Sequence, residues 1–240
     1  MPNWVKSNTA VTTTIIDTMY VQANSLPAPG LVVGIDEAGK GCVIGDLVIG
    51  AVFWLDETPI MDGLKDSKKL TKKRREKLFE KLRAACPCVT VGIHAWEIKP
   101  GNILERQIAA TRMIISRFRP SRVILDCPHP SPSRFVELLG FPKTTAEHKA
   151  DDTYPIVSAA SIVAKVTRDR RLAQFSQAAE SDMGSGYPGD SKCRAWLESL
   201  REHPDERSER FVRWGWSTCS DIFGESYVKG KLGSRQGADS

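Results

Sequence analysis

The chain has 240 residues, 41% of them hydrophobic, and a formal net charge of +5 at pH 7. These values suit one domain of ordinary size with a full core. No apolar run has the length of a membrane span, and no charged start precedes the apolar stretch of a signal peptide, which argues against a membrane or secreted protein.

The first predicted elements follow an N-terminal extension of uncertain order, residues 1–30, which is rich in Thr, Asn and Ser and ends in a linker. Apolar, β-branched and aromatic residues predict strands at 31–35, 47–55 and 89–96. The spacing of apolar residues predicts a helix over 71–85, between the second and third strands.

Helix and strand then alternate. Asn102 is typical of a helix start, and Pro120 ends that helix before a short strand at 122–125. Pro155 suits the first turn of a long helix, which a turn-rich segment and a further short helix follow. A flexible tail is expected over 224–240, which is rich in Gly, Ser and Lys. This order predicts a mixed α/β sheet that binds ligands at the carboxyl ends of its parallel strands.

Acidic residues follow two of the predicted strands. Asp36 and Glu37 end the first, Asp126 ends the strand at 122–125, and Asp151 lies just before the long helix. A single acid at a strand end is more often a cap or turn residue than a ligand. If the fold gathers all four, their oxygens favour Mg²⁺ or Mn²⁺ over zinc. Two such ions could support phosphodiester hydrolysis by water.

A glycine-rich turn follows the first acids, with Lys40 between Gly39 and Gly41. Its spacing differs from a dinucleotide fingerprint, and the acids would repel a pyrophosphate. A loop whose amides face a sugar–phosphate backbone fits better. The segment from Met61 to Arg83 has ten Lys or Arg and four acids, an excess larger than the net charge of the whole chain. This predicts a polyanion-binding region, although a solvated helix face gives the same pattern.

The six cysteines lack zinc-site spacing, so a reduced cytoplasmic protein with free thiols is expected.

Five segments, in order, carry a more specific pattern. They are Asp36-Glu37-Ala38-Gly39-Lys40-Gly41, Asp66-Ser67-Lys68-Lys69-Leu70, the block from His148 to Asp169, Gly184-Ser185-Gly186-Tyr187-Pro188, and Phe211-Val212-Arg213 with Trp216 and Thr218. Together they resemble the signatures of type 2 ribonuclease H (RNase HII) and look closest to its archaeal and eukaryotic-type branch.

The resemblance implies a ribonuclease H-like fold, with a mixed five-stranded sheet flanked by helices and a helical C-terminal region, over residues 31–223. It also implies an endonuclease that hydrolyses the RNA strand of RNA–DNA hybrids. The same enzyme would cut on the 5′ side of single ribonucleotides embedded in duplex DNA and leave 3′-hydroxyl and 5′-phosphate ends. Such an activity belongs to DNA replication and ribonucleotide excision repair.

By position, the resemblance makes four acids the catalytic and metal-binding residues: Asp36, Glu37, Asp126 and Asp151. It implies substrate binding by the glycine loop, a tyrosine and basic residues: Gly39, Lys40, Gly41, Ser67, Lys68, Lys165 and Tyr187. The loop would sense the ribose 2′-hydroxyl, which alone distinguishes RNA from DNA at a given sugar. Tyr187 would stack on the sugar beyond the ribonucleotide, and Lys165 serves equally well in an ion pair.

Three residues depart from the RNase HII pattern. Lys40 stands where arginine is usual and lacks its planar donor fork. Cys42 and Asp46 replace prolines common in this loop, and Asp46 could add negative charge near the metals. An RNase HIII-like hybrid nuclease is therefore one alternative, and a hybrid-binding protein with weak or no turnover is another. A monomer is expected, and no clear sliding-clamp motif is present in the tail.

Overall fold

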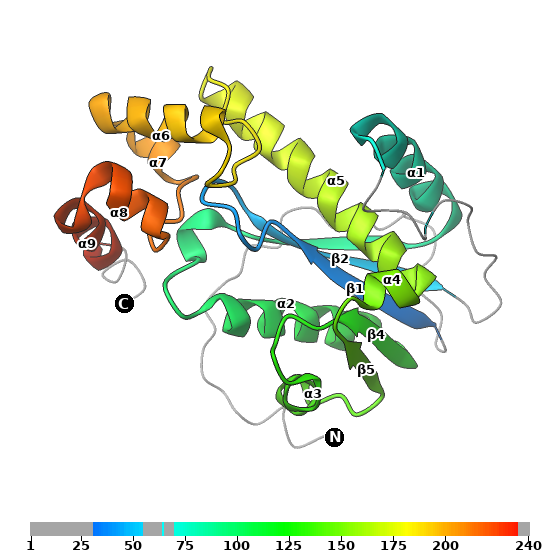
Figure 1. Cartoon of the computed structure of the whole chain (residues 1–240). Coiled ribbons are helices and arrows are strands. Elements are labelled where there is room, and N and C mark those ends of the chain that lie inside the picture. Colours follow the sequence, from blue (N-terminus) through cyan, green and yellow to red (C-terminus); the bar gives the residue numbers. More distant parts are fainter. Residues whose placement is uncertain (1–30, 55–63, 65–69, 235–240) are drawn as a thin grey trace.

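The computed structural model describes residues 31–54, 64 and 70–234 (Figure 1). The expected N-terminal extension, Ser67 and Lys68 lie outside these residues, as does part of the basic segment.

The centre of the fold is a five-stranded sheet. β1 pairs with β2 and β2 with β3 in antiparallel fashion, whereas β4 and β5 continue parallel to β1 on its other side. The strand order is β3-β2-β1-β4-β5, with β1 at Val32–Ala38, β2 at Leu47–Trp54, β3 at Cys88–Ile93, β4 at Arg122–Asp126 and β5 at Thr144–Glu147. The prediction of a mixed five-stranded sheet flanked by helices is confirmed.

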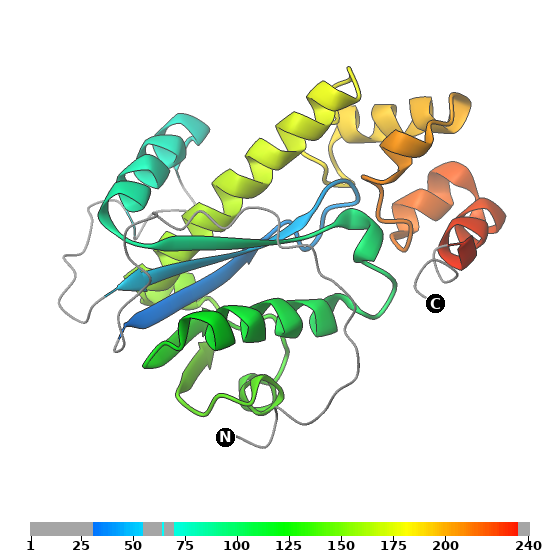
Figure 2. The same ribbon diagram turned by 180° about the vertical axis from the view of Figure 1, so that it is seen from behind.

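Helices cover both faces of this sheet. α2 (Ile103–Phe118) packs on one face and α5 (Pro155–Ala178) crosses the other, with α1 (Lys72–Ala85) beside it (Figures 1 and 2). α3 (Pro132–Leu139) and α4 (Ala150–Thr153) flank β5 and lead into α5. A helical C-terminal region gathers at one end of the sheet and contains α6 (Ser191–Glu202), α7 (Glu206–Glu209), α8 (Ser217–Phe223) and α9 (Glu225–Ser234).

Two glycines let α5 lie unusually close to the sheet. A Cβ built on Gly34 of β1 would stand 2.4 Å from the carbonyl oxygen of Ile156, and one on Gly50 of β2 would stand 2.6 Å from that of Ala160. Both distances are far below van der Waals contact, so no side chain fits there without moving the helix. The backbone of α5 therefore rests directly on the centre of the sheet.

Several local predictions need correction. The first strand continues to Ala38, so Asp36 and Glu37 lie inside it and not after it. Asn102 precedes α2 without a capping hydrogen bond, because its side-chain oxygen accepts from the Lys99 amide at 2.8 Å. The expected flexible tail is wrong for residues 225–234, where α9 packs Val228 into the C-terminal core.

Candidate active site

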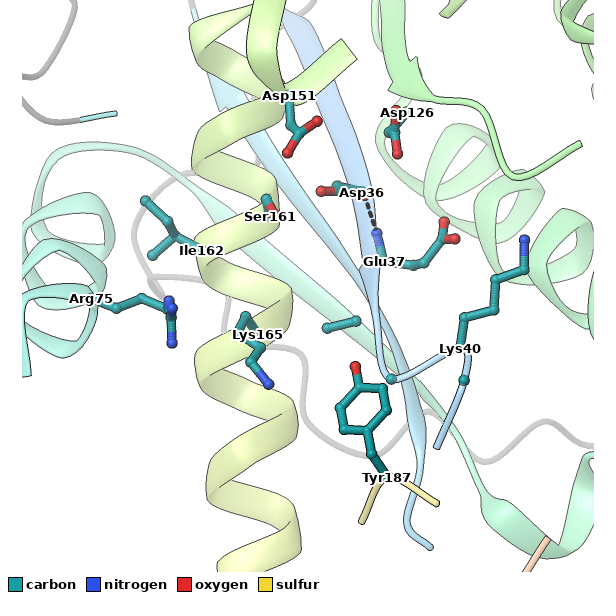
Figure 3. Close-up of a pocket in the computed structure, with 13 residues that line it drawn as sticks. Asp36, Glu37, Lys40, Arg75, Asp126, Asp151, Ser161, Ile162, Lys165 and Tyr187 are labelled. Carbon is teal, nitrogen blue, oxygen red and sulfur yellow. Dashed lines mark hydrogen bonds between the residues drawn. The ribbon is translucent and has the colours of Figure 1, made fainter. Parts of the chain in front are cut away.

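Four carboxylates from three elements line one pocket of about 380 Å³. Asp36 and Glu37 come from β1, Asp126 from the end of β4 and Asp151 from α4, and their side chains converge on one space (Figure 3). The parallel pairing of β1 with β4 brings the first three together at one edge of the sheet. The four acids singled out in the sequence are therefore neighbours in the fold.

The two acids of β1 approach the pocket from opposite faces of the sheet, because successive side chains of a strand alternate. Asp36 lies on the α5 face, where the nearby Ser161 hydroxyl favours its charged form. Glu37 lies on the α2 face with Ile35, near the Gln107 amide. The Glu37 backbone N–H donates to Asp36 Oδ1 at 2.7 Å. The site therefore spans the end of the sheet instead of lying on one face.

In the metal-free protein, the pKa values of Asp36 and Glu37 are raised, so both carboxyl groups resist ionisation. Burial raises the pKa of Asp36 well above its usual value, and the charges of Glu37 and Asp126 raise it further. Burial raises the pKa of Glu37 to about 7, although nearby Lys40 favours the charged form. A neighbouring cation would remove this penalty.

Asp126 also positions the fourth acid. Its Oδ1 accepts the backbone N–H of Ala150 at 2.9 Å, which fixes the start of α4 directly before Asp151. Among the described residues, no three His, Cys, Asp or Glu side chains already stand in a group that could hold a metal ion. The carboxylates therefore share a pocket without standing as a preformed set of metal ligands.

The glycine loop forms the next part of the pocket wall. Gly39 has a positive φ of 92°, and a Cβ there would stand 2.8 Å from the Asp46 carbonyl oxygen, so the position requires glycine. Lys40 is exposed, and its Nζ donates to the Pro128 carbonyl at 2.9 Å. Gly41 faces the ring of Tyr187.

A buried arginine from the C-terminal region holds this loop from below. Arg213 has no exposed surface and donates to the carbonyl oxygens of Gly39 at 2.7 Å, Lys40 at 3.1 Å and Gly45 at 2.8 Å. Its backbone N–H donates to the Val43 carbonyl at 2.9 Å. The helical C-terminal region is thereby joined to the loop beside the carboxylates.

Tyr187 stands at the mouth of the pocket with 39% of its surface exposed, an unusual value for so large a side chain here. The guanidinium of Arg168 lies 5.3 Å from its ring centre and donates to the Ser185 carbonyl at 2.6 Å and to Cys42 Sγ at 2.7 Å. Cys42 is buried beneath this group, as a small filling residue would be. The tyrosine ring is therefore supported from behind and open in front.

The expectation that Asp46 adds charge near the metals is wrong. Asp46 is 2% exposed, lies outside the pocket lining and faces Arg171 and His94. Burial alone would raise the pKa of Asp46, but hydrogen bonds and charges from His94 and Arg171 outweigh it and hold the pKa below its usual range. Its charge is therefore balanced locally.

Some basic residues line the pocket, and some form ion pairs within the protein. Arg75 of α1 and Lys165 of α5 both line the pocket. Lys165 also pairs with Asp169 at 2.9 Å, so it takes the ion-pair role that the sequence left open. His148 is exposed and lies 3.3 Å from the Pro130 carbonyl oxygen.

The sequence analysis missed three polar residues around the acids: Ser161, Gln107 and the supporting Arg213. Ser161 and Arg213 stand inside segments already singled out, so position in a motif was their available signal. Gln107 carries no such signal, because a glutamine on a helix is ordinarily exposed.

The raised pKa of Glu37 predicts how the stability of the metal-free protein changes with pH. The folded protein keeps a proton on Glu37 that an unfolded chain loses near pH 4.5, the ordinary pKa of a glutamate. Stabilisation from this group is thus present below that value and lost as pH rises through about 7. In chelator, the free energy of unfolding should fall by about 1–3 kcal/mol between pH 5 and 8 from this group. Urea titrations of wild type and Glu37→Gln test this, and an equal fall in both would contradict it.

Comparisons with known proteins agree with this arrangement. The family model for ribonuclease HII matches residues 33–219, which include all four acids, the glycine loop and Tyr187. The chain belongs to the ribonuclease HII family. It is therefore a ribonuclease H, and membership of ribonuclease HII takes precedence over the RNase HIII alternative.

Curated ribonuclease HII proteins of archaea resemble most of the chain. The Archaeoglobus fulgidus enzyme is 40% identical over 204 residues, which cover 79% of this chain and 95% of that protein. The Methanothermobacter thermautotrophicus enzyme is 41% identical over 203 residues, covering 78% and 96%. These archaeal relatives agree with the branch expected from the sequence.

Solved structures share the fold. Ribonuclease H2 of Pyrococcus horikoshii superposes with a TM-score of 0.72 at 36% identity and covers 83% of this chain and 99% of its own. The ribonuclease HII of Archaeoglobus fulgidus, solved in complex with PCNA, gives 0.70 at 37% identity, covering 78% and 95%. Bst-RNase HIII, solved with Mn²⁺, gives 0.68 at 17% identity, covering 82% and 71%, a likeness of fold alone. Within the described part of this ribonuclease HII chain, no helix is long and apolar enough to cross a membrane.

Proposed function

We propose that this ribonuclease HII hydrolyses the RNA strand of RNA–DNA hybrids and cuts on the 5′ side of single ribonucleotides embedded in duplex DNA. The products carry 3′-hydroxyl and 5′-phosphate ends. The observation that carries the proposal is one pocket lined both by four carboxylates and by the Gly39–Gly41 loop with Tyr187. This pocket thus combines a candidate cation site with a candidate reader of the sugar.

The donor set fits Mg²⁺ or Mn²⁺. All four groups are carboxylates, hard oxygen donors that these ions prefer. The burial and mutual repulsion that raise the pKa of Asp36 and Glu37 are the penalties that a divalent cation would offset. When bound, two such ions would supply Lewis acidity for attack by water and for charge on the leaving oxygen.

The residues of the chain bind and orient the strand. Backbone groups of the loop meet the ribose at short range, because Gly39 and Gly41 carry no side chain to block it. Lys40, Arg75 and Lys165 bring positive charge to the pocket wall, as sequence-independent phosphate binding requires. The rigid Tyr187 ring supports the neighbouring sugar and selects geometry without reading the base.

The presence of Lys40 where the family pattern has arginine favours recognition of the ribose 2′-hydroxyl by the backbone of the loop. The Lys40 ammonium is engaged with the Pro128 carbonyl at 2.9 Å, which stretches the side chain along the pocket wall. Sensing of the 2′-hydroxyl then depends on the loop amides and survives the exchange of arginine for lysine. Six buried cysteine thiols suit a cytoplasmic role in ribonucleotide removal during replication and repair.

Cleavage of two labelled substrates tests the proposal, a long RNA–DNA hybrid and a DNA duplex with one ribonucleotide, with the product ends mapped. We expect both to be cut, the second at the 5′ side of the ribonucleotide. Tyr187→Ala should lose about tenfold or more on the single ribonucleotide, because stacking on an aromatic ring is worth roughly 1–3 kcal/mol, and less on the hybrid. Tyr187→Phe is the matched control and should keep most activity.

The other outcomes have distinct meanings. Good cleavage of the hybrid with poor cleavage of the single ribonucleotide would mean RNase HIII-like specificity. Binding of the hybrid without cleavage, across a series of Mg²⁺ and Mn²⁺ concentrations, would mean a binding protein and would overturn the proposal.

A further inference from the structure

A second, small cavity lies behind the carboxylate pocket, on the α2 side of the sheet. It has a volume of about 10 Å³ and shares Glu37 and Asp126 with the main pocket. Its other polar lining comes from Gln107 and Thr111, one helical turn apart on α2, and the remaining wall is apolar. Polar groups of α2 thus reach Glu37 from the α2 side of the sheet.

Gln107 is an anomaly in its surroundings. Its side chain is 1% exposed and near enough to Glu37 to favour the charged carboxylate, yet neither amide atom is within hydrogen-bonding distance of a partner among the described residues. The rest of the buried face of α2 is apolar apart from Thr111, with Ala110 and Ile114 as neighbours. Burying an amide without partners is costly, and buried polar groups are almost always satisfied. A leucine or methionine would fill the position without the free-energy cost of burying an unsatisfied amide.

The cavity offers the partner. Its volume corresponds to about one water molecule, and a buried water needs two to four polar contacts. The lining supplies two carboxylates that accept, one hydroxyl that does either and one amide that does both. A water placed there would donate to Glu37 or Asp126 and accept from the Gln107 amide N–H, which then gains a partner.

We propose that Gln107 is a positioning residue for Glu37 and acts through one ordered water in this cavity, with Thr111 as its second anchor on α2. The inference rests on the proposed function, because it concerns how Glu37 is presented to the cation. Glu37 lies on the α2 face and Asp36 on the α5 face, so both carboxylates must turn toward the end of the sheet. A fixed contact behind Glu37 holds its side chain in that direction, as partners behind metal ligands do elsewhere.

Gln107→Met tests this, because methionine has similar length and no hydrogen-bonding group. Calorimetric titration with Mn²⁺ alone should give roughly 10- to 100-fold weaker binding than wild type. The kcat on a hybrid should fall at subsaturating Mn²⁺ while KM for the hybrid stays within about twofold, since Gln107 does not face the substrate. Ile115→Met, on the same helix and outside the cavity lining, is the matched control and should change neither.

Unchanged Mn²⁺ affinity and kcat in Gln107→Met would overturn the inference while hybrid cleavage by wild type still supports the proposed function. Absence of cleavage by wild type would reject the function, and the Mn²⁺ titration would still decide the role of Gln107. A high-resolution crystal structure of the unaltered protein gives a second test that needs no variant. A water bridging Gln107 and Glu37 is expected; a dry cavity, or an amide turned to another partner, would overturn the inference.

Discussion

Asp126→Asn should lower cleavage of a duplex with one embedded ribonucleotide by at least about a hundredfold, because it removes one charge from the group of acids that would hold the cation. Asparagine keeps the oxygen that accepts the Ala150 N–H, so the start of α4 should be preserved. The fold should therefore be unchanged, and stability should change little. Single-turnover cleavage and thermal unfolding of the same preparation measure the two effects separately.

The loss of charge also has an electrostatic signature. The Asp126 carboxylate raises the pKa of Glu37, so the variant should show a lower pKa for that group and a shallower fall of stability with pH. Glu137→Gln is a suitable control, because that acid is 65% exposed and pairs with nearby Arg134 in a surface bridge. Full activity in Asp126→Asn would remove Asp126 from the catalytic set.

Arg213→Met should destabilise the protein by about 2–4 kcal/mol, because three carbonyl oxygens, two of them in fully buried hydrogen bonds, lose a charged donor at once. Burial of the charged guanidinium is costly and lowers the pKa of Arg213 to about 10. The variant no longer carries this cost, which offsets part of the loss. Cleavage of the single ribonucleotide should fall by a further tenfold or more under conditions where the variant is folded, since a displaced loop misaligns the sugar. Urea unfolding and steady-state kinetics check the two parts.

Arg201→Met provides the comparison for this second experiment. Arg201 also donates to a backbone carbonyl, that of Ile222 at 3.2 Å, but its side chain is 50% exposed. Its loss should cost no more than about 0.5 kcal/mol and leave cleavage unaffected. If Arg213→Met selected ribonucleotides as well as wild type, the loop would not depend on this arginine for its shape.

The sequence was most informative where chemistry forces a choice of residue. The glycine at position 39 is hard to replace, and the resemblance to ribonuclease HII predicted Asp36, Glu37, Asp126 and Asp151 as a group that the fold brings into one pocket. The exact end of β1 could not, because Glu37 and Ala38 are held in the strand by pairing with Ile49 and Val48 of β2. Such pairing is a tertiary contact that an apolar run does not encode.

Elements stabilised by their neighbours also escaped prediction. β5 is short and polar and exists through parallel pairing with β4. α9 contains Gly and Ser, but Tyr227 and Val228 anchor it in the C-terminal core. The misplacement of Asp46 has the same origin, because its partners Arg171 and His94 are distant in the chain. Burial of polar side chains depends on such long-range contacts.

The close contact of α5 with Gly34 and Gly50 fixes the width of the pocket that holds the carboxylates. One wall of the pocket is α5, which carries Ser161, Lys165 and Arg168. The facing wall is formed by Asp36 of β1 and the glycine loop. The distance between these two walls is therefore set by how closely α5 packs on the glycine backbone of β1 and β2. A methyl group added at either glycine would push α5 away from the sheet and widen the pocket, so the two missing side chains set the distance between its walls.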